Sequence, residues 1–306
     1  MFVRSCGCHL AGFRGVFLPF FPASGFERNY YSKLKYFVNW DMGCPKRSPD
    51  EIFFVPPPIS SCYQQENTSS QMKNTDQNIP VTTLLFDMDN TLFDLVGAQI
   101  AACDAVVHHL GRNDGEELFS YFLNTAHGFE SHKNIREYLK TYRIPTNGTY
   151  DAACRIYDTE KLRHIVPYPG VNDTLVLLHR SGYPMGIVTD AEKKDATQRL
   201  EKCGIRSLFD CIVTFDAVQK KKPSPEPFRW ALRQMNVSPE EVLLVGDSPR
   251  RDIEPCRELG IRTAYARYGD RFSSGREAVL SDYVMDCIDQ LPVILDGCGA
   301  PRSRVK

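Results

Sequence analysis

Residues 81–92 read Val-Thr-Thr-Leu-Leu-Phe-Asp-Met-Asp-Asn-Thr-Leu, a short apolar run that ends abruptly in Asp87 and Asp89. A nearly all-apolar run of this length is typical of a strand buried in a parallel sheet. Open α/β sheets place their chemistry in the crevice at the carboxyl ends of such strands. The i, i+2 spacing lets two acids share a small volume, where they can hold a cation and present a carboxylate oxygen as a nucleophile. An acidic turn after an ordinary strand is the alternative that this stretch alone leaves open.

Three later segments also place polar residues at a strand end or a helix start. Residues 183–190 form a second apolar run that ends in Thr189 and Asp190. Residues 220–228 begin with Lys220-Lys221-Lys222-Pro223 and lead into a helix, with prolines where its first turn tolerates them. Residues 241–252 are another apolar run, followed by Gly246-Asp247-Ser248 and then by Asp252. Each of these features also has an ordinary alternative. Lys220-Lys221-Lys222 can be a solvated charge run, Asp247 a helix N-cap, and Asp252 a favourable charge in the first turn of a helix.

The hydrophobic pattern alternates between helix and strand periods over most of the chain. Residues 95 to about 167 are helical, with amphipathic segments at 98–110, 115–123 and 135–142. After residue 170 we expect helices at 172–181, 191–203, 225–236 and 250–259, and strands at 185–189, 211–214, 242–246 and 262–266. Asn172 and Ser238 have the character of helix-start residues. This alternation predicts parallel strands, right-handed crossovers and helices on both faces of the sheet.

The four motifs occur in the order Asp-x-Asp-x-Thr, strand-end Thr, Lys-Pro and Gly-Asp-Ser with a later Asp. In this order they resemble the haloacid dehalogenase-like (HAD) hydrolase superfamily, in its capped phosphatase branch. The resemblance covers residues 81 to about 290. It implies an α/β fold with a doubly wound parallel sheet, a HAD-like Rossmannoid core, and a small helical cap domain inserted after the first motif. It also implies hydrolysis of a phosphomonoester through an aspartyl-phosphate.

The resemblance assigns roles to the acids. Asp87 is expected to be the nucleophile and Asp89 the general acid/base. The expected cofactor is Mg²⁺, bound by the Asp87 and Asp247 carboxylates and the Asp89 backbone carbonyl, with Asp252 beside the ion or bound to it through water. Asp89 also argues against carbon–halogen cleavage, because displacing a halide needs neither a proton nor a metal.

The remaining candidates bind substrate. Thr189 is expected to donate to the phosphoryl group, Asp190 to add its backbone N–H, and Lys222 to neutralise the phosphate and hold Asp87. In the cap, residues 125–130 interrupt the helical pattern and are a candidate substrate loop. Cap side chains suited to anions or sugars are His127, His132, Lys133, Arg136 and Arg143. A solvated surface position is the ordinary alternative for each of them.

The expected domains are the catalytic core at 81–94 and 167–290, the cap at 95–166, and a C-terminal tail at 291–306. Residues 1–80 are expected to be an N-terminal extension that is disordered or absent from the mature enzyme. Its first 26 residues contain Arg4 and Arg14 but no acid, which is typical of a targeting presequence. The alternative is that translation starts at Met72.

Composition limits the classes of partner. Lys plus Arg total 37 against 38 for Asp plus Glu, so a net charge of −1 predicts no general attraction to nucleic acid or to anionic membranes. No apolar stretch has the length needed to span a bilayer. The 11 cysteines include no C-x-x-C pair, which favours free thiols in a reducing, cytoplasmic setting over a zinc or redox site.

The sequence therefore predicts a cytoplasmic, Mg²⁺-dependent phosphatase that acts on a small phosphorylated metabolite, such as a nucleotide, sugar phosphate or phosphoglycolate-like ester. A sugar-phosphate mutase is the alternative on the same scaffold, because it shares the first half-reaction. A regulatory protein on a retired enzyme fold is a further alternative, against which every catalytic position is intact.

Overall fold

A computed structural model describes residues 79–124, 127–273 and 279–298, which belong to one compact unit, Met72–Lys306. The expectations for residues 1–78, including the presequence and the start at Met72, lie outside the described residues. Within the described part of the chain, no helix is both long and apolar enough to cross a membrane.

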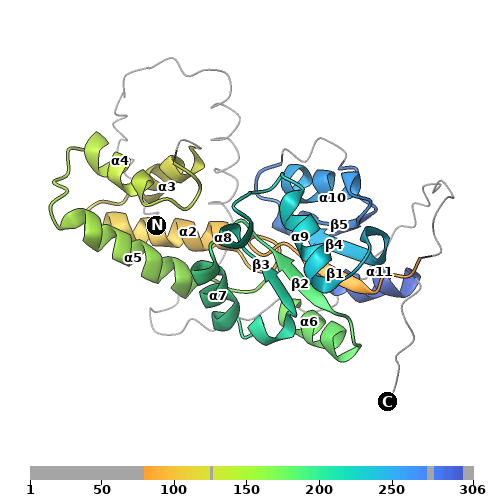
Figure 1. Cartoon of the computed structure of the whole chain (residues 1–306). Helices are drawn as coiled ribbons and strands as arrows, with labels where there is room; N and C mark the ends of the chain where they lie inside the picture. The colour runs from red at the N-terminus through yellow and green to blue at the C-terminus, as the bar shows by residue number, and fades with distance from the viewer. Residues whose placement is uncertain (1–78, 125–126, 274–278, 299–306) are drawn as a thin grey trace, which may run out of the picture. The chain divides into compact units, whose positions relative to one another are not determined.

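The centre of the fold is a six-stranded sheet in the order β3-β2-β1-β4-β5-β6, with every neighbouring pair parallel (Figure 1). The strands are β1 (Thr83–Phe86), β2 (Met185–Val188), β3 (Cys211–Val213), β4 (Val242–Gly246), β5 (Arg262–Ala266) and β6 (Tyr283–Met285). From β1 the chain winds outward to β3 on one side and then returns to add β4, β5 and β6 on the other. The doubly wound α/β prediction is confirmed, and the winding reverses between β1 and β4, where such sheets form their functional crevice.

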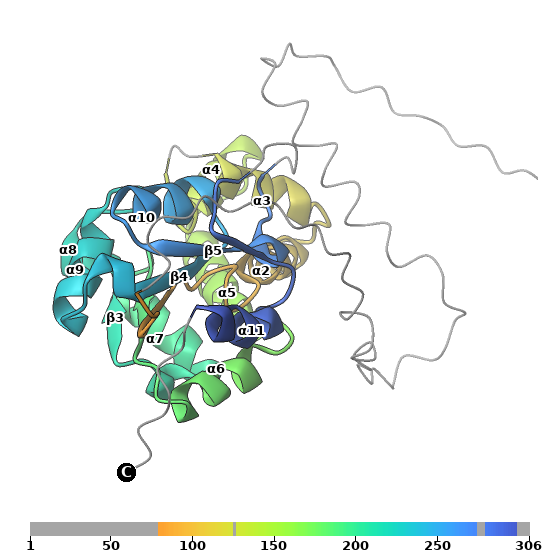
Figure 2. The ribbon, with the colours of Figure 1, turned by 90° about the vertical axis from the view of Figure 1, so that its right-hand side faces the viewer.

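Helices cover both faces of the sheet because successive side chains of a buried strand point to opposite sides. Leu84 and Phe86 of β1 join the apolar cluster under α6 (Val171–Arg180), α7 (Lys193–Lys202) and α11 (Leu291–Gly297). Leu85 joins the opposite cluster, under α9 (Glu226–Met235) and α10 (Glu254–Glu258). Figure 2 shows the two groups of helices enclosing the strands.

Of the five helices that the described chain has between β1 and β2, four have an apolar core of their own (Figure 1). They are α2 (Leu95–His109), α3 (Gly115–Leu123), α4 (Lys133–Thr141) and α5 (Thr149–His164). In this core Phe122 of α3 stacks on Tyr157 of α5, with ring centroids 4.8 Å apart. We call these helices and their connecting loops the cap. The sequence pattern indicated three of the helices, and the structure adds α5.

Several local expectations were wrong. Helix α6 begins after Gly170, whose φ is +81°, and Asn172 lies inside the helix with its side chain donating to the Cys203 carbonyl at 3.1 Å. Ser238 forms its capping box, yet the box closes only the 3-10 turn Pro239–Glu241 before β4. The helix expected at 250–259 is divided into the π-helical turn Pro249–Ile253 and α10.

The chain after the last expected strand, at 262–266, is also ordered on the sheet. Strand β6 extends the sheet beyond β5. Residue 291, expected to begin a tail, instead begins α11, and Leu291 and Leu295 are buried in the same cluster as β1. An apolar pair one helical turn apart explains why this segment docks. The short helix α8 (Phe215–Val218) completes the helices of the described residues.

Candidate active site

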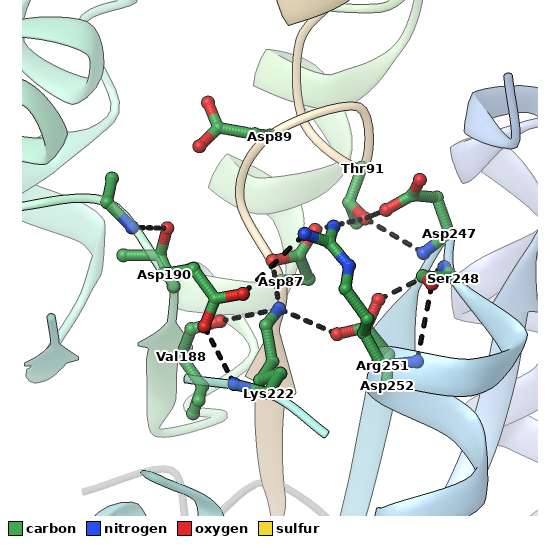
Figure 3. A network of polar contacts seen from close by, with 12 residues as sticks. Asp87, Asp89, Thr91, Val188, Asp190, Lys222, Asp247, Ser248, Arg251 and Asp252 are labelled. Atoms are coloured by element: carbon green, nitrogen blue, oxygen red, sulfur yellow. Dashed lines mark hydrogen bonds and ion pairs between the residues drawn. The ribbon is translucent and has the colours of Figure 1, made fainter. Parts of the chain in front are cut away.

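The motif residues gather because β1 pairs with both β2 and β4, so the carboxyl ends of all three strands lie side by side. Asp87 follows β1, Thr189 follows β2 and Asp247 follows β4. Figure 3 shows Asp87, Asp190, Lys222, Asp247 and Asp252 around one small volume.

Lys222 links the first and the last motif. Its Nζ donates to the Asp87 carboxylate, to Asp252 Oδ1 at 2.6 Å and to the Val188 carbonyl at 3.3 Å. Only 1% of its side chain is exposed, whereas Lys220 and Lys221 are exposed. The structure thus brings Lys222, rather than its two neighbours, to the proposed nucleophile.

Thr91 connects Asp87 with Asp247. Its hydroxyl lies 3.1 Å from Asp87 Oδ2 and 3.2 Å from Asp247 Oδ1, and its oxygen accepts from the Asp247 N–H at 3.1 Å. Since a hydroxyl has one hydrogen, Thr91 donates to one of the two carboxylates at a time. Asn90, at φ +64°, supports the same loop by accepting from the Val96 N–H at 3.1 Å.

Asp252 reaches the strand ends from the π-helical turn. Its Oδ1 accepts from Lys222, and its Oδ2 accepts from the Ser248 N–H at 3.0 Å. A Cβ on Gly246 would lie 2.6 Å from the Asp252 Cβ, so this close approach requires glycine. Because both oxygens of Asp252 already have protein partners, its first effect is to orient Lys222.

Asp87, Asp247 and Asp252, which we call the acidic cluster, are suited to a divalent cation. One oxygen from each lies within 4.8 Å of the others, and all three residues are buried. Burial raises the pKa of Asp247 well above its usual value, and the charges of Asp87 and Asp252 raise it further. Three carboxylates facing the two cations Lys222 and Arg251 leave excess negative charge. A hard cation that prefers oxygen ligands, such as Mg²⁺, fits this donor set.

Asp87 itself stays ionised. Burial acts to raise its pKa, but the charges of Lys222 and Arg251 outweigh burial and hold the pKa below its usual value. An ionised carboxylate beside an ammonium is the form that can attack an electrophile.

Asp89 differs from Asp87 in the direction of its side chain and in its pKa. Its side chain points away from the acidic cluster (Figure 3), and its Oδ1 accepts from Arg199 Nη1 at 2.7 Å. Burial raises the pKa of Asp89 to about 6, with contributions from Glu130 and Asp87 and against the effect of Arg199. A carboxyl with this pKa can both give and take a proton near neutral pH.

Thr189 and Asp190 complete the strand-end site. The Thr189 hydroxyl oxygen accepts from the Ala191 N–H at 3.1 Å, so its hydrogen can be donated to a ligand. Asp190 uses its side chain differently: Oδ1 accepts from the Lys222 N–H at 2.9 Å, and Oδ2 lies 3.5 Å from Arg251 Nη1. The Asp190 carboxylate therefore helps to position the backbone of Lys222, a role that the sequence did not indicate.

The cap candidates from the sequence contact other cap residues. His132 Nε2 lies 2.7 Å from Asp158, and Arg136 stacks at 4.3 Å over the ring of Tyr150. His127, Lys133 and Arg143 are exposed.

Instead, one residue of the candidate substrate loop at 125–130 reaches the core. Glu130 pairs with Arg199 of α7, and its Oε1 also accepts from Lys161 Nζ at 2.9 Å. Both cations are buried. The sequence carries only weak signals for this pairing. Arg199 follows the apolar spacing of an otherwise polar helix, and Glu130 lies in the segment that interrupts the helical pattern.

The fold gathers buried carboxylates at the carboxyl ends of neighbouring parallel strands, an arrangement typical of an α/β enzyme. Residues 84–266 match the haloacid dehalogenase-like hydrolase family, and the chain belongs to this family.

Relatives of known class agree with this assignment. Pyrophosphatase PpaX of Halalkalibacterium halodurans is 28% identical over 227 residues, which cover 72% of this chain and 97% of the relative. Pyrophosphatase PpaX of Bacillus velezensis is 29% identical over 217 residues, covering 69% and 94%.

Solved structures show the same fold. The magnesium-bound HAD hydrolase YfnB of Bacillus subtilis has a TM-score of 0.60 at 20% identity, covering 71% of this chain and 99% of its own. A HAD phosphatase of Thermococcus onnurineus has a TM-score of 0.53 at 25% identity, covering 72% and 100%. These similarities place the chain among the phosphatases of the family.

Proposed function

We propose that the chain is a Mg²⁺-dependent phosphatase that releases phosphate from a small phosphorylated metabolite through an aspartyl-phosphate on Asp87. One observation carries this proposal: a buried, ionised Asp87 lies against Lys222 in a cluster that has excess negative charge. The relatives named pyrophosphatases support a substrate with a phosphoryl group and suggest pyrophosphate as a compound to test.

In the first step, an oxygen of Asp87 attacks phosphorus while the bond to the leaving oxygen breaks. Lys222 lies against Asp87 and keeps its carboxylate ionised, and the same ammonium faces the incoming phosphoryl oxygens. The hydroxyl of Thr189 donates to one of those oxygens. Asp89 gives its proton to the leaving oxygen, so that the departing group leaves neutral at that atom.

In the second step, Asp89 removes a proton from water as the water attacks the aspartyl-phosphate. Inorganic phosphate leaves, the Asp87 carboxylate is restored, and Asp89 is again protonated for the next cycle. A pKa of about 6 for Asp89 suits both proton transfers.

Asp87 and Asp247 would hold the Mg²⁺, with Asp252 close by. When bound, the ion would offset the charge of the phosphate next to these carboxylates. Thr91 keeps Asp87 and Asp247 together.

The test is phosphate release from nucleotides, sugar phosphates, phosphoglycolate, pyrophosphate and an aryl phosphate, each with Mg²⁺ and again with excess chelator. We expect turnover that the chelator abolishes, and a rise in Tm on adding Mg²⁺ that Asp247→Asn removes. No phosphate release from any compound, although Mg²⁺ still raises Tm, would contradict the hydrolase. Formation of an isomerised sugar phosphate without phosphate release would identify a mutase instead.

A further inference from the structure

A chain of four charged groups connects the acid of the core with the cap. Arg199 Nη1 donates to Asp89 at 2.7 Å, and Arg199 Nη2 donates to Glu130 Oε1. The same Glu130 oxygen accepts from Lys161 Nζ at 2.9 Å. We call this chain the cap bridge. It runs from the loop after β1 through α7 and the α3–α4 loop to α5.

The two cations of the cap bridge are less accessible than the anion between them. The side chains of Arg199 and Lys161 are 2% and 9% exposed, whereas that of Glu130 is 26% exposed. A buried cation without an anionic partner is costly, so these two require a negative charge at this place. Glu130 supplies that charge from the side that solvent reaches.

The backbone beside Glu130 is held independently of its carboxylate. The Phe129 carbonyl accepts from Gln99 at 2.8 Å, the Gly128 carbonyl accepts from Asn134 at 2.9 Å, and the Phe129 ring packs edge-on against Phe272 at 5.8 Å. Rotation of the Glu130 side chain alone would therefore expose the two cations without unfolding the loop.

The cap bridge lies on the leaving-group side of the proposed reaction. Asp89 must reach the leaving oxygen to protonate it, and Arg199 is bound directly to Asp89. Atoms attached to the leaving oxygen consequently point toward the guanidinium. The second amino group of this guanidinium donates to Glu130.

We propose that the site selects phosphate compounds whose leaving group carries its own negative charge, which Arg199 and Lys161 bind in the place held by the Glu130 carboxylate. This proposal rests on the proposed phosphatase activity. The second anion is a carboxylate or a phosphate, because a guanidinium binds either in the same planar, charge-assisted manner. Glu130 is then an internal substitute for the substrate's second anion.

The experiment compares two substrates that differ only in this charge, phosphoglycolate and its neutral amide. The wild-type enzyme should prefer phosphoglycolate in kcat/KM by about 10- to 100-fold, the value of one charge-assisted interaction. Pyrophosphate, assayed in parallel, distinguishes a phosphate from a carboxylate as the preferred second anion.

Three variants test the residues. Arg199→Gln and Lys161→Met should each reduce the preference for phosphoglycolate by about tenfold or more. Arg199 also touches Asp89, so its variant slows both substrates, and the ratio isolates the effect on the second anion. Glu130→Gln should lower KM for phosphoglycolate by about three- to tenfold, because an internal competitor is removed, and leave KM for the amide unchanged. Lys194→Gln removes an exposed charge from the same helix and should behave as wild type.

The outcomes separate this proposal from the function on which it rests. Equal turnover of acid and amide, or an unchanged ratio in folded Arg199→Gln and Lys161→Met enzymes, would overturn the selection and reduce the cap bridge to a structural ion pair. In that case the phosphatase itself would stand. Failure of the wild-type enzyme to release phosphate from either compound, or from the wider panel, would instead contradict the phosphatase.

Discussion

The acidic cluster and the cap bridge are both buried arrangements of charge, but they are balanced differently. The acidic cluster sets three carboxylates against Lys222 and Arg251 and retains negative charge. The cap bridge alternates acid, base, acid and base, so that its charges cancel. The first arrangement favours an added cation, whereas the second is satisfied until another anion replaces Glu130.

This contrast has a thermodynamic consequence. Removing Asp247, whose pKa is raised by burial and by its acidic neighbours, relieves repulsion. Removing Glu130, the central acid of a balanced chain, leaves Lys161 without its anionic partner and Arg199 with Asp89 alone. The same type of substitution, acid to amide, should therefore have opposite effects on stability in the two places.

The largest expected effect is that of Asp87→Asn. An amide cannot form the aspartyl-phosphate, so turnover should fall by at least about 10⁴-fold. In the absence of Mg²⁺, Tm should fall, because Lys222 loses the ionised partner whose pKa it holds below the usual value. Phosphate release and a thermal melt measure both effects, with Asp296→Asn on the exposed face of α11 as the control. Normal turnover would exclude covalent catalysis through Asp87.

The next effect concerns Asp89, the core acid of the cap bridge. Asp89→Asn removes the proton donor and should slow the reaction by about 10²- to 10⁴-fold. The loss should be smaller for an aryl phosphate, whose leaving group needs less protonation, than for an alkyl phosphate. Steady-state rates over a series of leaving groups measure this slope. An equal loss for all leaving groups would assign Asp89 a role other than proton transfer.

A smaller effect is expected from crowding the acidic cluster. Gly246→Ala would press a methyl group against Asp252, whose Cβ lies 2.6 Å from the position of the new atom. We expect a loss of about 1–3 kcal/mol in the free energy of unfolding, together with reduced kcat as Lys222 shifts. Gly297→Ala, where the added carbon meets nothing within 4 Å, is the matched control for urea unfolding. Equal stability of the two variants would mean that the π-helical turn yields easily.

The smallest effect is the pH dependence of the cap bridge. Burial acts to raise the pKa of Glu130, but Arg199 and Lys161 outweigh burial and hold the pKa at about 2, below its usual value of 4.5. A lowered pKa gives stability that is present above pH 4.5 and is lost as the pH falls toward 2. By linkage, the loss between neutral pH and pH 3.5 is on the order of 1 kcal/mol.

The measurement compares the free energy of unfolding of wild type and Glu130→Gln between pH 7 and pH 3.5. The variant should be less stable at pH 7 and show a flatter decline. Glu226→Gln removes a carboxylate from an exposed ion pair with Arg229 and should keep the wild-type slope. A parallel decline in wild type and Glu130→Gln would show that the cap bridge does not titrate in this range.

Much of the catalytic core was predictable because its signals are local. An apolar run followed by acids marks a strand end wherever it occurs, and parallel strands bring such ends together at one edge of the sheet. These local signals predict that Asp87, Thr189, Lys222, Asp247 and Asp252 lie at one edge of the sheet, and the structure places them there. Helix boundaries were predicted less well. The Asn172 side chain donates to the Cys203 carbonyl from inside a helix, and the capping box of Ser238 closes only a short 3-10 turn.

The sequence by itself determined the doubly wound sheet, the family and the acids at the strand ends, since each depends on residues close together in the chain. Only the tertiary structure decided which charges meet across the site. Arg199 is 110 residues from Asp89 and 69 from Glu130, and no local pattern reports such a pairing. The pairing exists because the cap is inserted between two strands and folds back to bury Arg199 and Lys161 against an acid from its own loop.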